Sequence, residues 1–115
     1  MKSMQSMTFN ILARKENDLW VAHCLELDIV ATSNSLADLK KEMEDLIITQ
    51  VDHAFSNNNL DNLYHPAPPE VWSLFYACKE SIEKKIKMRP GFSGNSFVPP
   101  WIIANTCINR EAALA

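Results

Sequence analysis

The amino-acid sequence predicts an α+β domain in which an antiparallel β-meander is followed by a crossover helix. The length of 115 residues fits one domain, and the proportions of apolar (47%) and charged (22%) residues are close to the globular average. Three short strand patterns come first, and one long helical pattern follows them. We therefore expect a single domain over residues 1–115, with a frayed N-terminus (1–6), a βββα core (7–57), a loop rich in proline and asparagine (58–69), a helix and a final strand (70–108) and a tail (109–115).

The three strands are predicted from short-range patterns. Residues 7–14 alternate between apolar and polar side chains, which is typical of a half-buried strand. Asn17 and Asp18 tolerate the positive φ that a tight hairpin needs, so a second strand is expected over 19–24. A third short strand is expected over 28–33. The second strand is apolar on both faces, so both faces of the sheet need cover.

The first helix has the clearest pattern in the chain. Ser35 is a suitable N-cap, and Asp38 three residues later approximates a capping box. Apolar residues such as Leu39 and Met43 then recur at helical spacing as far as Phe55. The opposite side of the helix is charged, so one apolar face should pack on the sheet.

A second amphipathic helix is predicted over residues 70–87. The prolines before it suit a first helical turn. The apolar stripe consists of Val71, Leu74, Phe75, Cys78, Ile82 and Ile86. Glu80 with Lys84 and Glu83 with Lys87 form favourable i,i+4 pairs. We expect this helix to pack on the sheet or to take part in an oligomer.

The last strand is expected over residues 101–108, where apolar side chains occupy both faces. Trp20, Trp72 and Trp101 are interpreted as core residues rather than interface anchors. The two-faced sheet still presents more apolar surface than one domain of this size covers. We therefore expect a homo-oligomer, either a dimer or a larger assembly.

Glycine and cysteine usage narrows the function. Gly91 and Gly94 are the only glycines, so the chain has no Walker loop, no dinucleotide-binding turn and no nucleophile elbow. No cofactor is therefore expected. The N-terminus has no apolar block typical of a secretory signal. Cys24, Cys78 and Cys107 are widely spaced, and we expect them to be reduced, buried thiols in a cytoplasmic protein.

No catalytic or metal-binding residue is predicted. His23 and Cys24 are neighbours on a strand and so point to opposite faces. A metal-dependent nuclease would need several converging carboxylates, but the polar side of the first strand carries Asn10 and Arg14. No stretch approaches the roughly 20 apolar residues that span a bilayer, so no membrane association is expected.

Acidic residues concentrate between positions 26 and 52. Seven carboxylates and two lysines give this segment a net charge of −5: Glu26, Asp28, Asp38, Glu42, Glu44, Asp45 and Asp52 against Lys40 and Lys41. Such a surface is either an ordinary solvated helix face or a surface that steers a basic partner. The candidate partner-contact residues are Glu26, Asp28, Glu42, Glu44 and Asp45.

One basic run stands out near the end of the second predicted helix. It contains Lys84, Lys85, Lys87 and Arg89, where cations would interact favourably with the helix dipole. The net charge of the chain is −3, and no exposed aromatic residues are interleaved with these cations. Direct nucleic-acid binding is therefore not expected.

The segment from Thr8 to about Phe55 resembles the HicB-like antitoxin domain. The matching pieces are Leu-Trp-Val-Ala at 19–22, Glu26-Leu27 before the third strand, and the small polar step at 31–36 into a helix that continues as Leu-Lys-Lys-Glu-Met. The match covers roughly 50 of the 115 residues. It implies a partial RNase H-like fold of the form βββα(α)β, without nuclease activity.

The resemblance also implies a role. HicB antitoxins bind a small basic RNA-cleaving toxin and cover its active site, so a non-enzymatic toxin-masking protein is expected. Residues 60–115 contain no convincing helix-turn-helix or ribbon-helix-helix segment, which is the usual DNA-binding part of the family. The alternative is a stand-alone, self-assembling HicB-fold protein without toxin or DNA binding.

Overall fold

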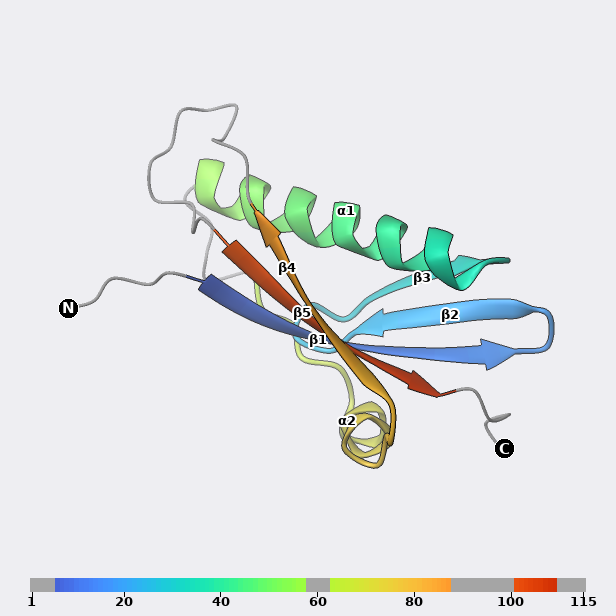
Figure 1. Ribbon diagram of the computed structural model, residues 1–115. Coiled ribbons are helices and arrows are strands. Elements are labelled where there is room, and N and C mark those ends of the chain that lie inside the picture. Colours follow the sequence, from blue (N-terminus) through green and yellow to red (C-terminus); the bar gives the residue numbers. More distant parts are fainter. Residues whose placement is uncertain (1–5, 58–62, 88–100, 110–115) are drawn as a thin grey trace.

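The computed structural model describes residues 6–57, 63–87 and 101–109 (Figure 1). These residues form five strands and two helices, so the predicted α+β class is confirmed. The elements are β1 (Ser6–Glu16), β2 (Leu19–Cys24), β3 (Ile29–Ser33), α1 (Leu36–Ser56), α2 (Pro69–Tyr76), β4 (Ser81–Lys87) and β5 (Trp101–Asn109). Most of the predicted frayed N-terminus, most of the tail, and Arg89 lie outside the described residues.

The strands form one mixed sheet in the order β3-β2-β1-β5-β4. β1 pairs in parallel with β5, with Phe9 opposite Ala104, and all other neighbours are antiparallel. β1, β2 and β3 form the predicted antiparallel meander. The full βββα(α)β topology is not confirmed, because β4 is an additional strand. The strand order differs because β5 lies directly beside β1, where it extends the sheet on the side away from β2.

The local turn and capping predictions are confirmed. Asn17 has a φ of 58° in the β1–β2 turn. The Ser35 hydroxyl accepts a hydrogen bond from the backbone N–H of Asp38 at 3.3 Å, so it caps α1 as expected. The third strand begins at Ile29 rather than at Asp28. Asp28 has a φ of 56°, a left-handed conformation that a strand cannot include.

The predicted second helix over residues 70–87 is wrong beyond Tyr76, because residues 81–87 form β4. Ile82 and Ile86 are four residues apart, and this spacing places them on one face of either a helix or a strand. Antiparallel pairing with β5, with Ile86 opposite Ile102, selects the strand. Residues four apart in a strand are separated by about 13 Å, so the predicted i,i+4 ion pairs have no helical basis.

The lysines of the basic run therefore lie on an edge strand and not at a helix end. Lys84, Lys85 and Lys87 all belong to β4, which makes the helix-dipole interpretation wrong for them. The Lys85 ammonium lies 5.5 Å from the centre of the Trp101 ring, a cation–π geometry. Alternation along β4 places Lys84 on the opposite side of the sheet, towards α1.

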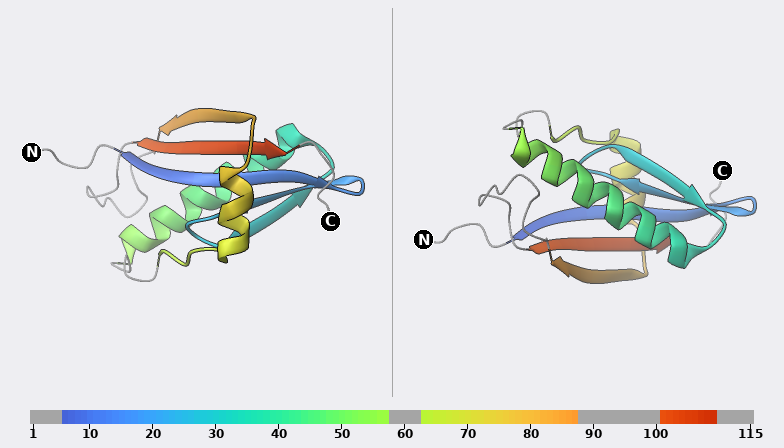
Figure 2. Two further views of the ribbon diagram at one scale, coloured as in Figure 1. Left: turned by 90° about the horizontal axis from the view of Figure 1, so that it is seen from below. Right: turned by 90° about the horizontal axis from the view of Figure 1, so that it is seen from above.

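Each face of the sheet is covered by one helix (Figure 2). The larger core lies under α1, where Met43, Ile47 and Phe9 belong to one buried cluster. Trp20 is also buried there as predicted, whereas Trp72 and Trp101 are only partly buried. A smaller cluster of Leu12, Leu25, Ala67 and Cys107 lies on the other face, against partly buried residues of α2. Neither helix is long and apolar enough to cross a membrane.

The expectation of three reduced thiols is wrong for two of them. Cys78, just after α2, forms a disulfide with Cys107 on β5, with the Cα atoms 6.0 Å apart. The fold brings them together because Cys107 lies on the sheet face that α2 covers. Cys24 is a buried free thiol, and desolvation raises its pKa to about 12. The predicted cytoplasmic location was based partly on reduced cysteines, so the disulfide removes that argument.

Candidate partner-contact surface

The outward face of α1 carries two of the predicted contact residues. Leu39, Met43 and Ile47 are buried against the sheet, so the residues between them point away from it. Glu42 and Asp45 are exposed there. The Lys41 ammonium lies 3.9 Å from the Asp45 carboxylate, and both side chains remain largely exposed. This ion pair is therefore loose, and the face keeps its acidic character.

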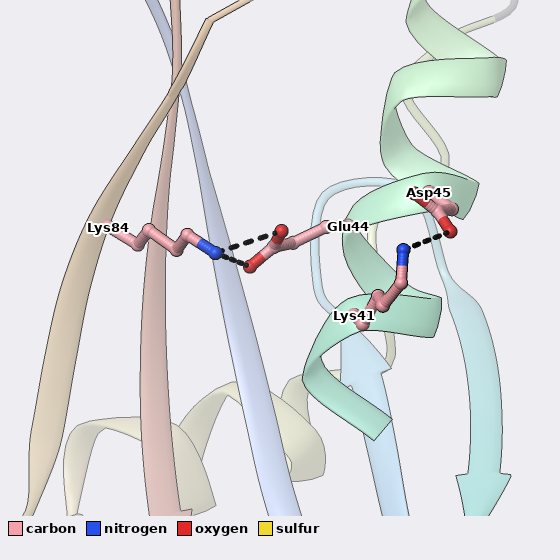
Figure 3. Close-up of polar contacts among 4 residues, drawn as sticks. All are labelled: Lys41, Glu44, Asp45 and Lys84. Carbon is pink, nitrogen blue, oxygen red and sulfur yellow. Dashed lines mark hydrogen bonds and ion pairs between the residues drawn. The ribbon is translucent and has the colours of Figure 1, made fainter. Parts of the chain in front are cut away.

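Glu44 points sideways from α1 towards the edge of the sheet. Its carboxylate accepts from the Lys84 ammonium, with N–O distances of 2.9 and 3.2 Å (Figure 3). The Glu44 side chain is only 18% exposed. Glu44 therefore joins α1 to β4, which are 40 residues apart in sequence at these two positions. The sequence pattern missed this contact because it placed Lys84 in a helix.

We expect the Glu44–Lys84 ion pair to contribute modestly to stability. A double-mutant cycle with Glu44→Gln and Lys84→Met should give a coupling energy of up to about 1 kcal/mol. The Lys84 side chain is 60% exposed, so water solvates its ammonium group well even without the ion pair. Urea unfolding of the four proteins measures it. The matched cycle at Lys41 and Asp45 should give a smaller value. A coupling of about 3 kcal/mol at Glu44–Lys84 would contradict this expectation, since that is the range of buried pairs.

A cleft of about 370 Å³ lies beside this ion pair, between α1 and β4. Small side chains form much of its floor, including Ala13, Ala22 and Ala104. Lys40, Lys41 and Glu44 of α1 and Ile82 and Lys84 of β4 are also among the residues that line it. The described lining contains no cysteine, histidine or serine. The cleft therefore has a floor of mainly apolar side chains, together with Thr106, and a rim of charged side chains.

Glu26 has partners within the fold. Its carboxylate accepts hydrogen bonds from the Asn10 backbone N–H at 2.7 Å and from the Asn10 side-chain amide at 2.6 Å. Asn105 Nδ2 in turn donates to Asn10 Oδ1 at 3.3 Å. Burial, and then the nearby Glu26 charge, raise the pKa of Tyr64. Glu26 thus connects the β2–β3 turn to β1.

Asp28 is also tied to its surroundings. His23 Nε2 lies 2.6 Å from Asp28 Oδ1, and the His23 side chain is only 14% exposed. Because His23 is opposite Leu12 in the β1–β2 ladder, it faces the α2 side of the sheet. The pair holds the positive-φ residue at the end of the turn.

The five predicted contact residues therefore do not form one patch. Glu26 and Asp28 are bound to groups on the α2 side of the sheet, whereas Glu42, Glu44 and Asp45 belong to α1 on the other side. Composition alone could not show that Glu26, Asp28 and Glu44 have partners within the chain, because these contacts form only when the chain folds.

Other chemistry has little support in the described part of the chain. No group of three histidine, cysteine, aspartate or glutamate side chains there is arranged to hold a metal ion. Comparison with protein-family models, with curated proteins and with solved structures found no match for this chain.

Proposed function

We propose that this protein is a HicB-like, antitoxin-type binding module that masks a small basic RNA-cleaving toxin and has no enzymatic activity of its own. The observation that carries the proposal is the outward face of α1. Asp38, Glu42 and Asp45 are exposed on this face, and Lys41 offsets only part of their charge. The HicB-like pattern over Thr8 to Phe55 supplies the class of partner.

Electrostatics supports this choice of partner. An RNA-cleaving protein needs cationic side chains to hold the phosphate backbone. An exposed acidic face attracts such a protein over distances of about 10 Å at moderate salt and raises the association rate. The same attraction weakens as salt rises. A solvated helix also suits steric masking, because it projects from the sheet as a continuous ridge (Figure 1).

The structure sharpens which acids to test. Glu26, Asp28 and Glu44 accept short hydrogen bonds or ion pairs within the chain, so replacing them would disturb the fold as well as any partner. The Asp45 ion pair with Lys41 is longer, at 3.9 Å, and largely exposed. Glu42 and Asp45 lie on the exposed face. These two residues are the ones we expect to contribute most to toxin binding.

The experiment is affinity purification of the tagged protein from its native host at mild salt, followed by mass spectrometry. A small basic partner in stoichiometric amount, lost at high salt, is the expected result. The partner, once purified, should be inhibited as a ribonuclease by this protein. A stoichiometric partner that is acidic or that cleaves no RNA would contradict the toxin-masking function.

Reversing the charge of the outward face should weaken the complex. We expect the double variant Glu42→Lys, Asp45→Lys to lower the association rate with the partner about tenfold or more at low salt, with a smaller difference at high salt. Surface plasmon resonance at several salt concentrations measures this. The matched control is Glu16→Lys, Asp18→Lys, which reverses two exposed acids on and beside the β1–β2 turn. Equal rates for both double variants would contradict the α1 surface.

A stand-alone, self-assembling protein is the second candidate, and one observation favours it. Large apolar side chains remain exposed around the α2 side of the chain, including Leu74 (43%) and Tyr76 (73%) of α2 and Val30 (53%) of β3. Exposed large apolar side chains of this kind can take part in an interface between copies. Self-association without any stoichiometric partner in the purification would favour this candidate.

A further inference from the structure

The two edges of the sheet differ in their protection against pairing. The strand order places β3 at one edge and β4 at the other (Figure 2). β4 carries four charged residues in seven: Glu83, Lys84, Lys85 and Lys87. Charged side chains, lysine above all, are the usual means by which an edge strand avoids pairing with another chain. β3 has the sequence Ile-Val-Ala-Thr-Ser and carries no charge. β3 is therefore the unprotected edge.

β3 is also held in a conformation that suits pairing. Ala31 is buried in the main core and Ile29 packs against it, so one face of the strand is anchored under α1. Val30 and Thr32 alternate with them and are exposed on the other face. Among the described residues, β2 is the strand that pairs with β3. Within the described part of the chain, no other strand pairs with the outer backbone donors and acceptors of β3, which leaves them available for pairing.

We propose that β3 is a homodimer interface, at which the strands of two copies pair antiparallel and join the two sheets into one. The register that pairs all five residues has a two-fold axis at Ala31. It sets Val30 of each copy opposite Thr32 of the other, and Ile29 opposite Ser33. Because these pairs keep the alternation of faces, the anchored residues of both copies stay on the same side of the joined sheet.

A second copy fits this edge by charge as well as by backbone geometry. No like charges oppose each other in this register, and just beyond the strand ends Asp28 of one copy meets Asn34 of the other. The corresponding two-fold pairing of β4 would set Lys84 opposite Lys84 of the second copy, although Glu83 would lie opposite Lys85. It would also place the Lys84 ammonium, which already pairs with Glu44, beside a second ammonium. This inference does not depend on toxin masking, because it uses the edge of the sheet and not the outward face of α1.

The test is sedimentation equilibrium of the full chain from about 5 to about 500 µM, a range that brackets the micromolar dissociation constants of small interfaces. Two double variants share the change Val30→Lys. Combined with Thr32→Lys, it places like charges opposite each other at both cross-strand pairs. Combined with Thr32→Glu, it places opposite charges there. Circular dichroism checks that each variant folds.

We expect wild type to dimerise, the lysine–lysine variant to be monomeric at the concentrations where wild type dimerises, and the lysine–glutamate variant to dimerise again. A monomeric wild type over the whole range would overturn the proposal. So would equal dimerisation of all three proteins, which would place the interface elsewhere. Loss of the dimer in both variants would also overturn it, because opposite charges in the proposed register should be tolerated.

Discussion

Reducing the Cys78–Cys107 disulfide is expected to lower the free energy of unfolding by about 3 to 4 kcal/mol, because the bond closes a loop of 29 residues and so restricts the unfolded chain. The bond also links the segment after α2 to β5, which keeps α2 close to the sheet face that it covers. Urea unfolding with and without a reductant, followed by circular dichroism, measures the change.

The double variant Cys78→Ser, Cys107→Ser is the control for this prediction. It should unfold at the same urea concentration with and without reductant, since Cys24 has no bond to lose. Wild type should approach its midpoint when reduced. A reductant shift in wild type no larger than the shift in the double variant would show that the bond is absent in solution or contributes nothing.

Replacing Phe9 with alanine is expected to lower the free energy of unfolding by about 3 to 5 kcal/mol. Phe9 is fully buried on β1, the middle strand of the sheet, and its ring centre lies 6.4 Å from that of Tyr64. Truncation removes apolar surface from the core and leaves a cavity that the rigid sheet cannot close. Urea unfolding of Phe9→Ala measures the loss.

Two variants calibrate the Phe9 result. Phe9→Leu keeps most of the buried volume and should cost less than Phe9→Ala. Val30→Ala truncates an exposed side chain on the same sheet and should cost about 0.5 kcal/mol or less. If Phe9→Ala proved no more destabilising than Val30→Ala, the burial of Phe9 in the core under α1 would be incorrect.

The parts of the fold that depend on near neighbours could be predicted from the sequence. The Asn17 turn and the Ser35 cap each depend on residues within a few positions, and both were expected. β4 could not be separated from a helix, because Ile82 and Ile86 satisfy both periods. Its strand conformation comes from β5, which is distant in sequence.

The candidate site also has one part that could be predicted from the sequence and one part that could not. That Glu42 and Asp45 are exposed follows from helical periodicity, which the sequence contains. That Glu44 is held by Lys84, and Glu26 by Asn10, depends on contacts between distant parts of the chain. The Cys78–Cys107 bond was missed for the same reason, since parallel pairing of β5 with β1 is needed before Cys107 faces α2.

The position of β5 has a consequence for how the protein folds as it is synthesised. β2 follows β1 directly in the chain and pairs with one side of it, but the other side of β1 is paired by β5, with Asn10 and Asn105 separated by 95 residues. Until residues 101–109 have left the ribosome, β1 is an unpaired edge with an apolar face, which exposes the nascent chain to aggregation. We therefore expect the sheet to be completed only after β5 has been synthesised and has paired with β1.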